Sequence, residues 1–229
     1  MGIVRMGLPE EIVLYLKELS KIELFIETGT FSGWTSYWAS SHFNLVKTIE
    51  FSVKFYHEAK KTHANLSNVD FIFGDSRKEL TNIISKINEP AIFWLDAHWC
   101  GSESYGVNDQ CPILEEIEII ISSRFENIIL IDDARLFLSP PPLPNSTEYY
   151  PSVSEILSKF VTKKYHTIIY EDALISIPKI YKKDFVNFMQ NRANEDEIIY
   201  NKLMKKKEDL KKIKRFIKKS IFYKYWRNV

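Results

Sequence analysis

The chain has few glycines, few cysteines and no long apolar run, and each shortage excludes a class of protein. Only 7 of 229 residues are glycine and 45% are hydrophobic, which excludes collagen-like and disordered chains. Two cysteines, Cys100 and Cys111, are too few for a disulfide framework and make a weak zinc signal. No apolar run approaches the roughly 20 residues that cross a bilayer. A secretory leader is not evident, so we expect a cytoplasmic protein.

What the chain does contain is an alternation of short apolar runs with longer amphipathic stretches. This pattern is typical of βα units that build a parallel sheet with helices on both faces. It predicts strands at residues 23–27, 46–50, 69–73, 91–96, 127–132, 166–170 and 173–177. Only Glu171 and Asp172 separate the last two strands, so these should form an antiparallel hairpin. We therefore predict a Rossmann-like α/β domain over residues 1–180 and a basic helical extension over residues 181–229.

The first predicted strand runs into a turn that contains two glycines. Glycines let a backbone turn tightly and approach a ligand, and a carboxylate at a strand end can attract the cationic end of a cofactor. A single glycine-containing turn is a weak motif. Its residues are nevertheless candidate cofactor ligands: Glu27, Gly29, Thr30, Phe31, Ser32 and Gly33.

The next two strand ends carry further candidates. Glu50 ends the second strand, where Rossmann-like sites place a carboxylate that accepts hydrogen bonds from both ribose hydroxyls. A solvated glutamate at a strand end is the alternative. The third strand is followed by Gly74, Asp75 and Ser76, of which Asp75 can also be the N-cap of the next helix. With Phe51, and with Asp96 at the end of the fourth strand, these residues complete the predicted cofactor site.

Three aspartates gather at the predicted ends of the fourth and fifth strands. Asp96 ends one apolar run, and Asp132 and Asp133 end the next. Carboxylates that converge at adjacent strand ends repel one another, and they either take up protons or recruit a cation. Oxygen ligands favour Mg²⁺ or a similar hard divalent ion over zinc.

Taken together and in this order, the motifs resemble those of class I S-adenosylmethionine-dependent methyltransferases. The resemblance extends to the metal-dependent O-methyltransferases of the catechol and macrocin types, whose fourth strand gives one aspartate and whose fifth gives an Asp-Asp or Asp-Asn pair. It implies S-adenosylmethionine as cofactor, five parallel strands closed by the antiparallel hairpin, and Asp75 near the adenine amino group. It also implies a divalent metal held by Asp96, Asp132 and Asp133.

The sequence departs from the catechol type at the position of that family's lysine base, where it has Trp99. His98 is the nearest replacement, because a neutral imidazole with a pKa near 6.5 can accept a proton. A structural role for this histidine is equally consistent with the sequence. His98 and Asp96 are therefore the candidate catalytic residues.

Two loops and one positive charge are expected near the acceptor. Residues 100–112 form a polar loop that should border the acceptor pocket. Residues 139–150 contain four prolines and should form a semi-rigid flap, because proline fixes φ and donates no ladder hydrogen bond. Arg135 can hold an acidic acceptor group or pair with a neighbouring aspartate.

The net charge of +1 hides an asymmetry. Residues 202–227 contain twelve Lys or Arg against Glu208 and Asp209, and we expect helices near residues 181–191 and 195–219. Such a basic amphipathic helix could pack on the acidic domain or a second subunit, which charge complementarity slightly favours. It could instead lie on an anionic membrane. Nucleic acid is the least favoured partner, because no recognition module is evident.

The resemblance to the macrocin type implies that the acceptor is a sugar hydroxyl, in a polysaccharide or natural-product intermediate. Methylation of RNA by the same fold is an alternative. A catalytically silent scaffold is another, although the retained acidic positions argue against it. A short-chain dehydrogenase is disfavoured, because the Gly-x-Gly-x-x-Gly turn is incomplete and no suitably placed Tyr-x-x-x-Lys pair is present.

Overall fold

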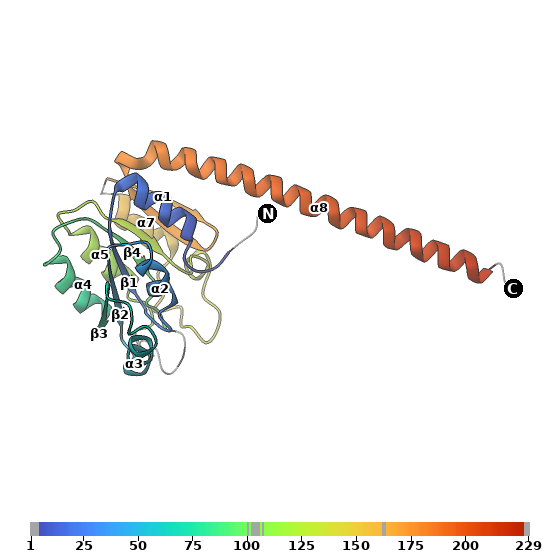
Figure 1. Ribbon diagram of the computed structural model, residues 1–229. Coiled ribbons are helices and arrows are strands. Elements are labelled where there is room, and N and C mark those ends of the chain that lie inside the picture. Colours follow the sequence, from blue (N-terminus) through green and yellow to red (C-terminus); the bar gives the residue numbers. More distant parts are fainter. Residues whose placement is uncertain (1–4, 100, 102–105, 107, 162–163, 227–229) are drawn as a thin grey trace. The chain divides into compact units, whose positions relative to one another are not determined.

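A computed structural model describes residues 5–99, 101, 106, 108–161 and 164–226 (Figure 1). The chain divides into two compact units, one formed by Arg5–Lys182 and the other containing the chain from Lys183 onward. Cys100 and part of the predicted polar loop lie outside the described residues. Cys111 is buried and is not in a disulfide.

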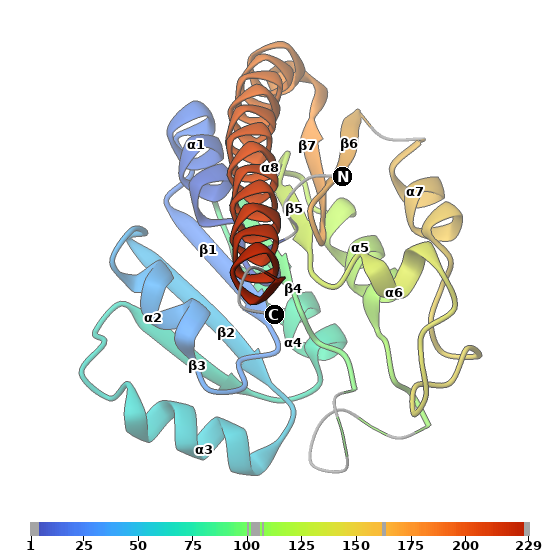
Figure 2. The ribbon, with the colours of Figure 1, turned by 90° about the vertical axis from the view of Figure 1, so that its right-hand side faces the viewer.

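Seven strands form one mixed sheet in the unit Arg5–Lys182, in the order β3-β2-β1-β4-β5-β7-β6 (Figure 2). Strands β1 to β5 run parallel, and β7 pairs antiparallel with both β5 and β6. The predicted Rossmann-like sheet with its closing hairpin is therefore confirmed. The strands are β1 Leu24–Thr28, β2 Leu45–Glu50, β3 Val69–Phe73, β4 Ala91–Leu95, β5 Ile128–Ile131, β6 Tyr165–Tyr170 and β7 Ala173–Pro178.

Helices cover both faces of this sheet (Figure 2). One face carries α1 Glu10–Ser20, α2 Trp34–Ser40 and α3 Val53–Thr62. The other carries α4 Ser76–Ile84, α5 Ile113–Ile121 and α7 Val153–Val161, with α4 packed on α5 and α5 on α7. Because α2, α3 and α4 each begin shortly after a parallel strand ends, their N-termini lie along one edge of the sheet.

The central strands are apolar because both of their faces are covered. Every residue of β1, β4, β5 and β7 is buried, whereas the edge strands β3 and β6 are only partly buried. Strands covered on both faces give continuous apolar runs rather than alternation, which is the pattern seen in the sequence. The polar residues that come after these runs, including Asp96 and Asp132, therefore lie just past the strand ends.

The segment of residues 139–152 connects the short helix α6, Arg135–Leu138, to α7 without a helix or strand. This agrees with the predicted proline-rich loop, in which the Leu143–Pro144 peptide bond is cis.

The second unit differs from the prediction, because it holds one long helix rather than two. A short 3₁₀ turn at Lys179–Tyr181 leads directly into α8, Lys182–Trp226. The prediction of a break between residues 191 and 195 is wrong. The sequence after Pro178 contains neither glycine nor proline, so no residue there interrupts the helical hydrogen bonds. Among the described residues, no helix is both long and apolar enough to cross a membrane.

Candidate active site

A cavity of ≈ 290 Å³ lies at the carboxyl ends of β1 to β4. It combines aromatic rings with a few polar groups, as small-ligand sites do, and its volume is near the lower end of their range. The lining residues are Gly29, Phe31, Ile49, Glu50, Phe51, Phe55, Gly74, Ser76, Asp96, Ala97 and His98. The cavity therefore brings together most of the predicted cofactor residues. It adds Phe55, which lies one turn into α3 and belongs to no motif.

Gly29 is required by the close approach of two strand ends. Its φ is +86°, and a Cβ atom at this position would lie 2.4 Å from the carbonyl oxygen of Asp96. The Asp96 N–H donates to the carbonyl oxygen of Thr28 at 3.0 Å, and the Gly29 N–H donates to that of Ile49 at 2.9 Å. The glycine turn is thus packed against the segment that carries Asp96 and His98.

Three other residues of the turn, Thr30, Ser32 and Gly33, hold its shape rather than line the cavity. The hydroxyls of Thr30 and Thr48 share a hydrogen bond of 2.5 Å. Gly33 begins α2 with a φ of +79°, and a Cβ atom there would lie 2.7 Å from the ring of His63. Nε2 of that histidine is 3.0 Å from the carbonyl oxygen of Ser32.

Glu27 also faces the protein rather than the cavity. Its carboxylate accepts hydrogen bonds from the hydroxyls of Ser36 at 2.5 Å and Thr48 at 2.7 Å, and its side chain is buried. Burial raises the pKa of Glu27 to about 7, and the two hydroxyls limit the rise. These contacts fasten β1 to α2 and β2, so a direct attraction of Glu27 to a cofactor has no support in this geometry.

Glu50 is held in place by backbone groups and faces the cavity. One carboxylate oxygen accepts the N–H of Phe31 and the other accepts the N–H of Ser52, each at 2.8 Å. An ionised carboxylate has about four acceptor positions, so two remain for a ligand. A fixed, buried carboxylate with two spare acceptor positions is suited to a pair of hydroxyl groups, such as those of a ribose.

After β3, Asp75 and Ser76 have different roles. Asp75 caps α4 by accepting the Arg77 N–H at 2.9 Å and pairs with the Arg77 guanidinium, which lowers the pKa of Asp75. It does not line the cavity, and the alternative role as an N-cap is observed. Ser76 does line the cavity. Glu116 of α5, which belongs to no sequence motif, is completely buried, and burial raises its pKa to about 7.

The predicted acidic residues meet at the ends of β4 and β5, where His98 bridges two of them. Its Nδ1 lies 3.4 Å from Oδ1 of Asp96, and its Nε2 lies 3.1 Å from Oδ2 of Asp133. Asp133 also pairs with Arg135, at 2.6 Å. Of the two interpretations of Arg135, pairing with a neighbouring aspartate is the one observed.

These contacts set the protonation of the cluster. Burial disfavours a charge on His98, but hydrogen bonds to Asp133 and Asp96 outweigh it and raise the pKa of His98 to about 10. The two carboxylates therefore favour the protonated form of His98, whereas the role as a base that the sequence predicts needs the neutral imidazole. Burial, followed by the negative charge of Asp96, raises the pKa of Asp132 to about 7. Burial opposes ionisation of Asp133, yet His98 and Arg135 lower its pKa overall.

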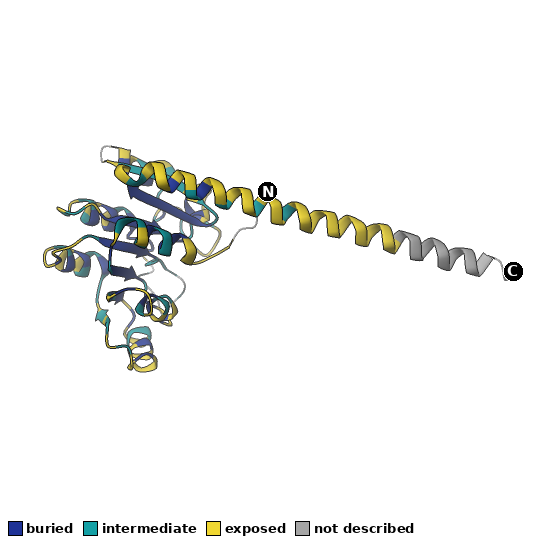
Figure 3. Cartoon of the chain, turned by 45° about the horizontal axis from the view of Figure 1, so that its top comes forward, coloured by how far each residue is buried: buried dark blue, intermediate teal, exposed yellow. Residues whose placement is uncertain are grey.

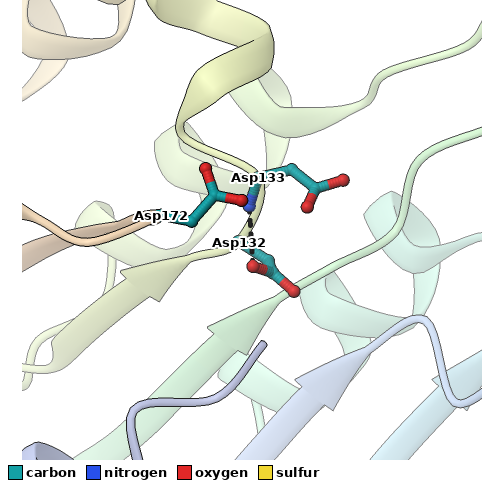
Figure 4. A group of neighbouring side chains, drawn as sticks. All are labelled: Asp132, Asp133 and Asp172. Carbon is teal, nitrogen blue, oxygen red and sulfur yellow. Dashed lines mark hydrogen bonds between the residues drawn. The ribbon is translucent and has the colours of Figure 1, made fainter. Parts of the chain in front are cut away.

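Asp172 is a member of the cluster that the sequence motifs did not reveal. Asp132, Asp133 and Asp172 each place a carboxylate oxygen within 4.8 Å of the others (Figure 4). Asp172 lies in the turn between β6 and β7 and accepts the backbone N–H of Arg135 at 3.0 Å. Its carboxylate also pairs with the guanidinium of that arginine. Asp96, the third ligand that the resemblance implies, lies outside this group of three and contacts His98 instead.

The charge of this acidic cluster, defined as Asp96, Asp132, Asp133 and Asp172, fits a divalent cation. Four carboxylates face two protein cations, His98 and Arg135. Burial, followed by the negative charge of Asp96, raises the pKa of Asp132, and a further cation beside this carboxyl would favour its ionised form. Carboxylate oxygens are the ligands that Mg²⁺ prefers, and a divalent ion would supply the two missing positive charges.

The polar loop before α5 and the proline-rich loop are tied together. The side-chain oxygen of Gln110 accepts the backbone N–H of Ser146 at 2.8 Å, and the carbonyl oxygen of Gln110 accepts the N–H of Trp99 at 2.8 Å. Gln110 is buried. The described parts of both loops are therefore anchored to the segment that follows β4.

Comparison with known proteins bears on the fold. No protein-family model matches the sequence, and no curated protein matches it. A Staphylococcus aureus structure described as a caffeoyl-CoA O-methyltransferase has a TM-score of 0.54 at 17% identity, over 76% of this chain and 86% of that one. The Podospora anserina methyltransferase PaMTH1, bound to S-adenosylhomocysteine, has a TM-score of 0.51 at 16% identity, over 76% of this chain and 80% of that one. The fold is that of the class I methyltransferases.

Replacing Gly29 by alanine should disrupt the junction of β1 and β4. A Cβ atom cannot lie 2.4 Å from a backbone oxygen, so the turn must move away from Asp96. We expect Gly29→Ala to lower the free energy of unfolding by more than about 1 kcal/mol in urea titrations. Gly106→Ala is the control, because a Cβ atom there meets nothing within 4 Å. Equal stability of the two variants would contradict the close approach.

The buried carboxyl of Glu116 should make stability fall as the pH rises. Its folded-state pKa of about 7 exceeds the ordinary value of 4.5, so the stabilising proton is lost as the pH passes through 7. Between pH 4.5 and 8 this contributes up to about 3 kcal/mol, which Glu116→Gln should remove from the pH dependence in urea titrations. The exposed neighbour Glu115→Gln should leave it unchanged. An identical pH profile for both variants would refute the buried, raised pKa.

Proposed function

We propose that this protein is an S-adenosylmethionine-dependent methyltransferase that acts on a hydroxyl oxygen. The supporting observation is that one cavity joins the anchored carboxylate of Glu50 to the edge of the acidic cluster at Asp96. A nucleoside that carries a sulfonium cation matches both ends. It offers two ribose hydroxyls to Glu50 and a positive charge to the carboxylates. The S-adenosylhomocysteine bound to PaMTH1, which shares the fold, is consistent with this cofactor.

The remaining walls of the cavity suit the other parts of this cofactor. Phe31, Phe51 and Phe55 provide aromatic surface for the nucleoside. Ser76 lines the cavity beside the end of β3, where the resemblance expects the adenine. The backbone at Gly29 can approach the ligand closely because no side chain intervenes.

Asp96 and His98 are the proposed catalytic residues, because both line the cavity, Asp96 belongs to the acidic cluster and His98 contacts two of its members. Methyl transfer needs the acceptor oxygen, the methyl carbon and the sulfur in line, and positioning alone can supply about 7–11 kcal/mol. His98 is fixed on two sides by carboxylates. In its neutral form it would be placed to accept the proton that an acceptor hydroxyl beside the cluster gives up.

We further propose that the enzyme uses a divalent metal such as Mg²⁺. Asp132 and Asp133 would hold it, together with Asp172 or Asp96. When bound, such an ion acts as a Lewis acid on the acceptor hydroxyl and favours its ionised form.

The proposed acceptor is a sugar hydroxyl in a polysaccharide or natural-product intermediate. This rests on the resemblance of Asp96 and the Asp132-Asp133 pair to the macrocin type. Arg135 is engaged by two carboxylates, which favours a neutral acceptor over an acidic one.

Removal of the Glu50 carboxylate charge should weaken cofactor binding. We expect Glu50→Gln to raise the Kd for S-adenosylhomocysteine about 100-fold in calorimetry, because hydrogen bonds to a charged acceptor contribute about 1.5–3 kcal/mol each. Glu58→Gln, on the exposed side of α3, is the control and should bind normally. If NAD bound and S-adenosylhomocysteine did not, the proposed function would fail.

Loss of Asp133 should abolish turnover and spare cofactor binding. Asp133→Ala removes one oxygen ligand and one partner of His98, while the cavity near Glu50 stays intact. We expect methyl transfer from labelled S-adenosylmethionine to a panel of sugars to fall at least about 100-fold, and a chelator to have a similar effect on the unaltered protein. Asp70→Ala, at an exposed position of β3, is the control. Full activity after chelation would exclude the metal.

A further inference from the structure

Helix α8 contains a stretch that is exposed on every side and strongly basic. Each residue from 201 to 214 is exposed (Figure 3). This stretch contains seven lysines against Glu208 and Asp209. Lysines in successive turns repel one another, and helices gain most of their stability from packing of an amphipathic face. A partner that offsets the positive charge would therefore stabilise the stretch.

One side of the same helix is apolar. At 100° per residue, Ile199, Leu203, Leu210 and Ile213 fall within an arc of about 80°. We call these four residues the apolar stripe. Their side chains are between 44% and 54% exposed. Lysines flank the stripe on both sides, so the partner must accept apolar side chains and positive charges together.

A second copy of the helix fits the stripe poorly. Paired along the stripe as a coiled coil, the helices would bury Lys206, which lies between Leu203 and Leu210 on the same face. In a parallel pair, Lys202 of one helix would also face Lys207 of the other. Burial of an ammonium group without a counter-ion and repulsion between facing lysines both oppose this pairing.

A nucleic acid would bind the lysines of this stretch but not its apolar stripe. Phosphates attract lysines, but Leu and Ile gain nothing from a sugar-phosphate backbone. Residues 201–214 contain no aromatic side chain on which bases could stack. A bilayer surface of anionic lipid accepts both features, since apolar side chains enter the headgroup boundary while lysines remain at the phosphates.

We propose that α8 docks the protein on the surface of a membrane that contains anionic lipid. The apolar stripe enters the interface, and the flanking lysines contact the lipid phosphates. Lys206, within the stripe, reaches the same phosphates because its long aliphatic stem can lie among apolar groups while the ammonium stays at the headgroups. The helix lies along the surface, because its charged residues recur in every turn. The proposal rests on α8 alone and is independent of the methyl-transfer reaction.

The test measures co-sedimentation of the full chain with vesicles. One set contains phosphatidylcholine alone, and the other contains equal parts of phosphatidylcholine and phosphatidylglycerol. We expect at least about tenfold tighter binding to the anionic vesicles, because several lysines near such a surface each add attraction. This binding should weaken as salt is added. Equal binding to both sets, or no binding to either, would overturn the proposal.

Two variants separate a membrane from the other partners. Leu203→Ser with Leu210→Ser should weaken vesicle binding about tenfold or more, because the stripe loses its largest side chains. Met204→Ser is the matched control, since it changes an exposed apolar residue on the opposite side of the helix. The double variant overturns the proposal if it binds anionic vesicles as tightly as the control. Tighter binding to a homopolymeric RNA than to vesicles, unaffected by the double variant, would also overturn it. So would a dimer that forms through the apolar stripe and does not bind vesicles.

Discussion

The candidate site depends on one electrostatic constraint, the gathering of carboxylates where neighbouring strands end. Parallel strands bring their ends to a single edge, so Asp96, Asp132 and Asp133 meet there whatever their distance in the sequence. Four carboxylates, including Asp172, face two protein cations, His98 and Arg135. The excess of carboxylates would attract positively charged ligands, and the sulfonium cofactor and the divalent metal are both proposed for that reason.

Backbone geometry connects this charge to the cavity. Gly29 packs against the carbonyl of Asp96. The glycine turn and the segment that carries Asp96 are therefore fixed relative to each other. Glu50, at the end of the neighbouring strand β2, is fixed by two backbone donors. Because backbone contacts hold both Gly29 and the Glu50 carboxylate, the sheet sets the separation between that carboxylate and Asp96.

Features that depend only on the order of the strands were predictable from the sequence. Continuous apolar runs located the strands, the two-residue turn predicted the hairpin, and the residues at or just after the end of each run supplied most of the cavity lining. Contacts between distant segments could not be predicted in this way. Asp172 joins the cluster only because β7 pairs with β5, and Glu27 faces α2 because its carboxylate accepts the hydroxyl of Ser36. The pKa of His98 is raised by partners at the ends of two different strands, which residue type alone does not reveal.

The hydrogen bond between Gln110 and Ser146 has a consequence for how acceptor preference could change during evolution. It links two loops that are far apart in the sequence. An insertion that shifts one loop would therefore also shift the other, through the buried side-chain amide of Gln110. Selectivity would then be a joint property of the pair. Grafting one loop from a related enzyme would carry over little of that enzyme's preference unless its counterpart came with it.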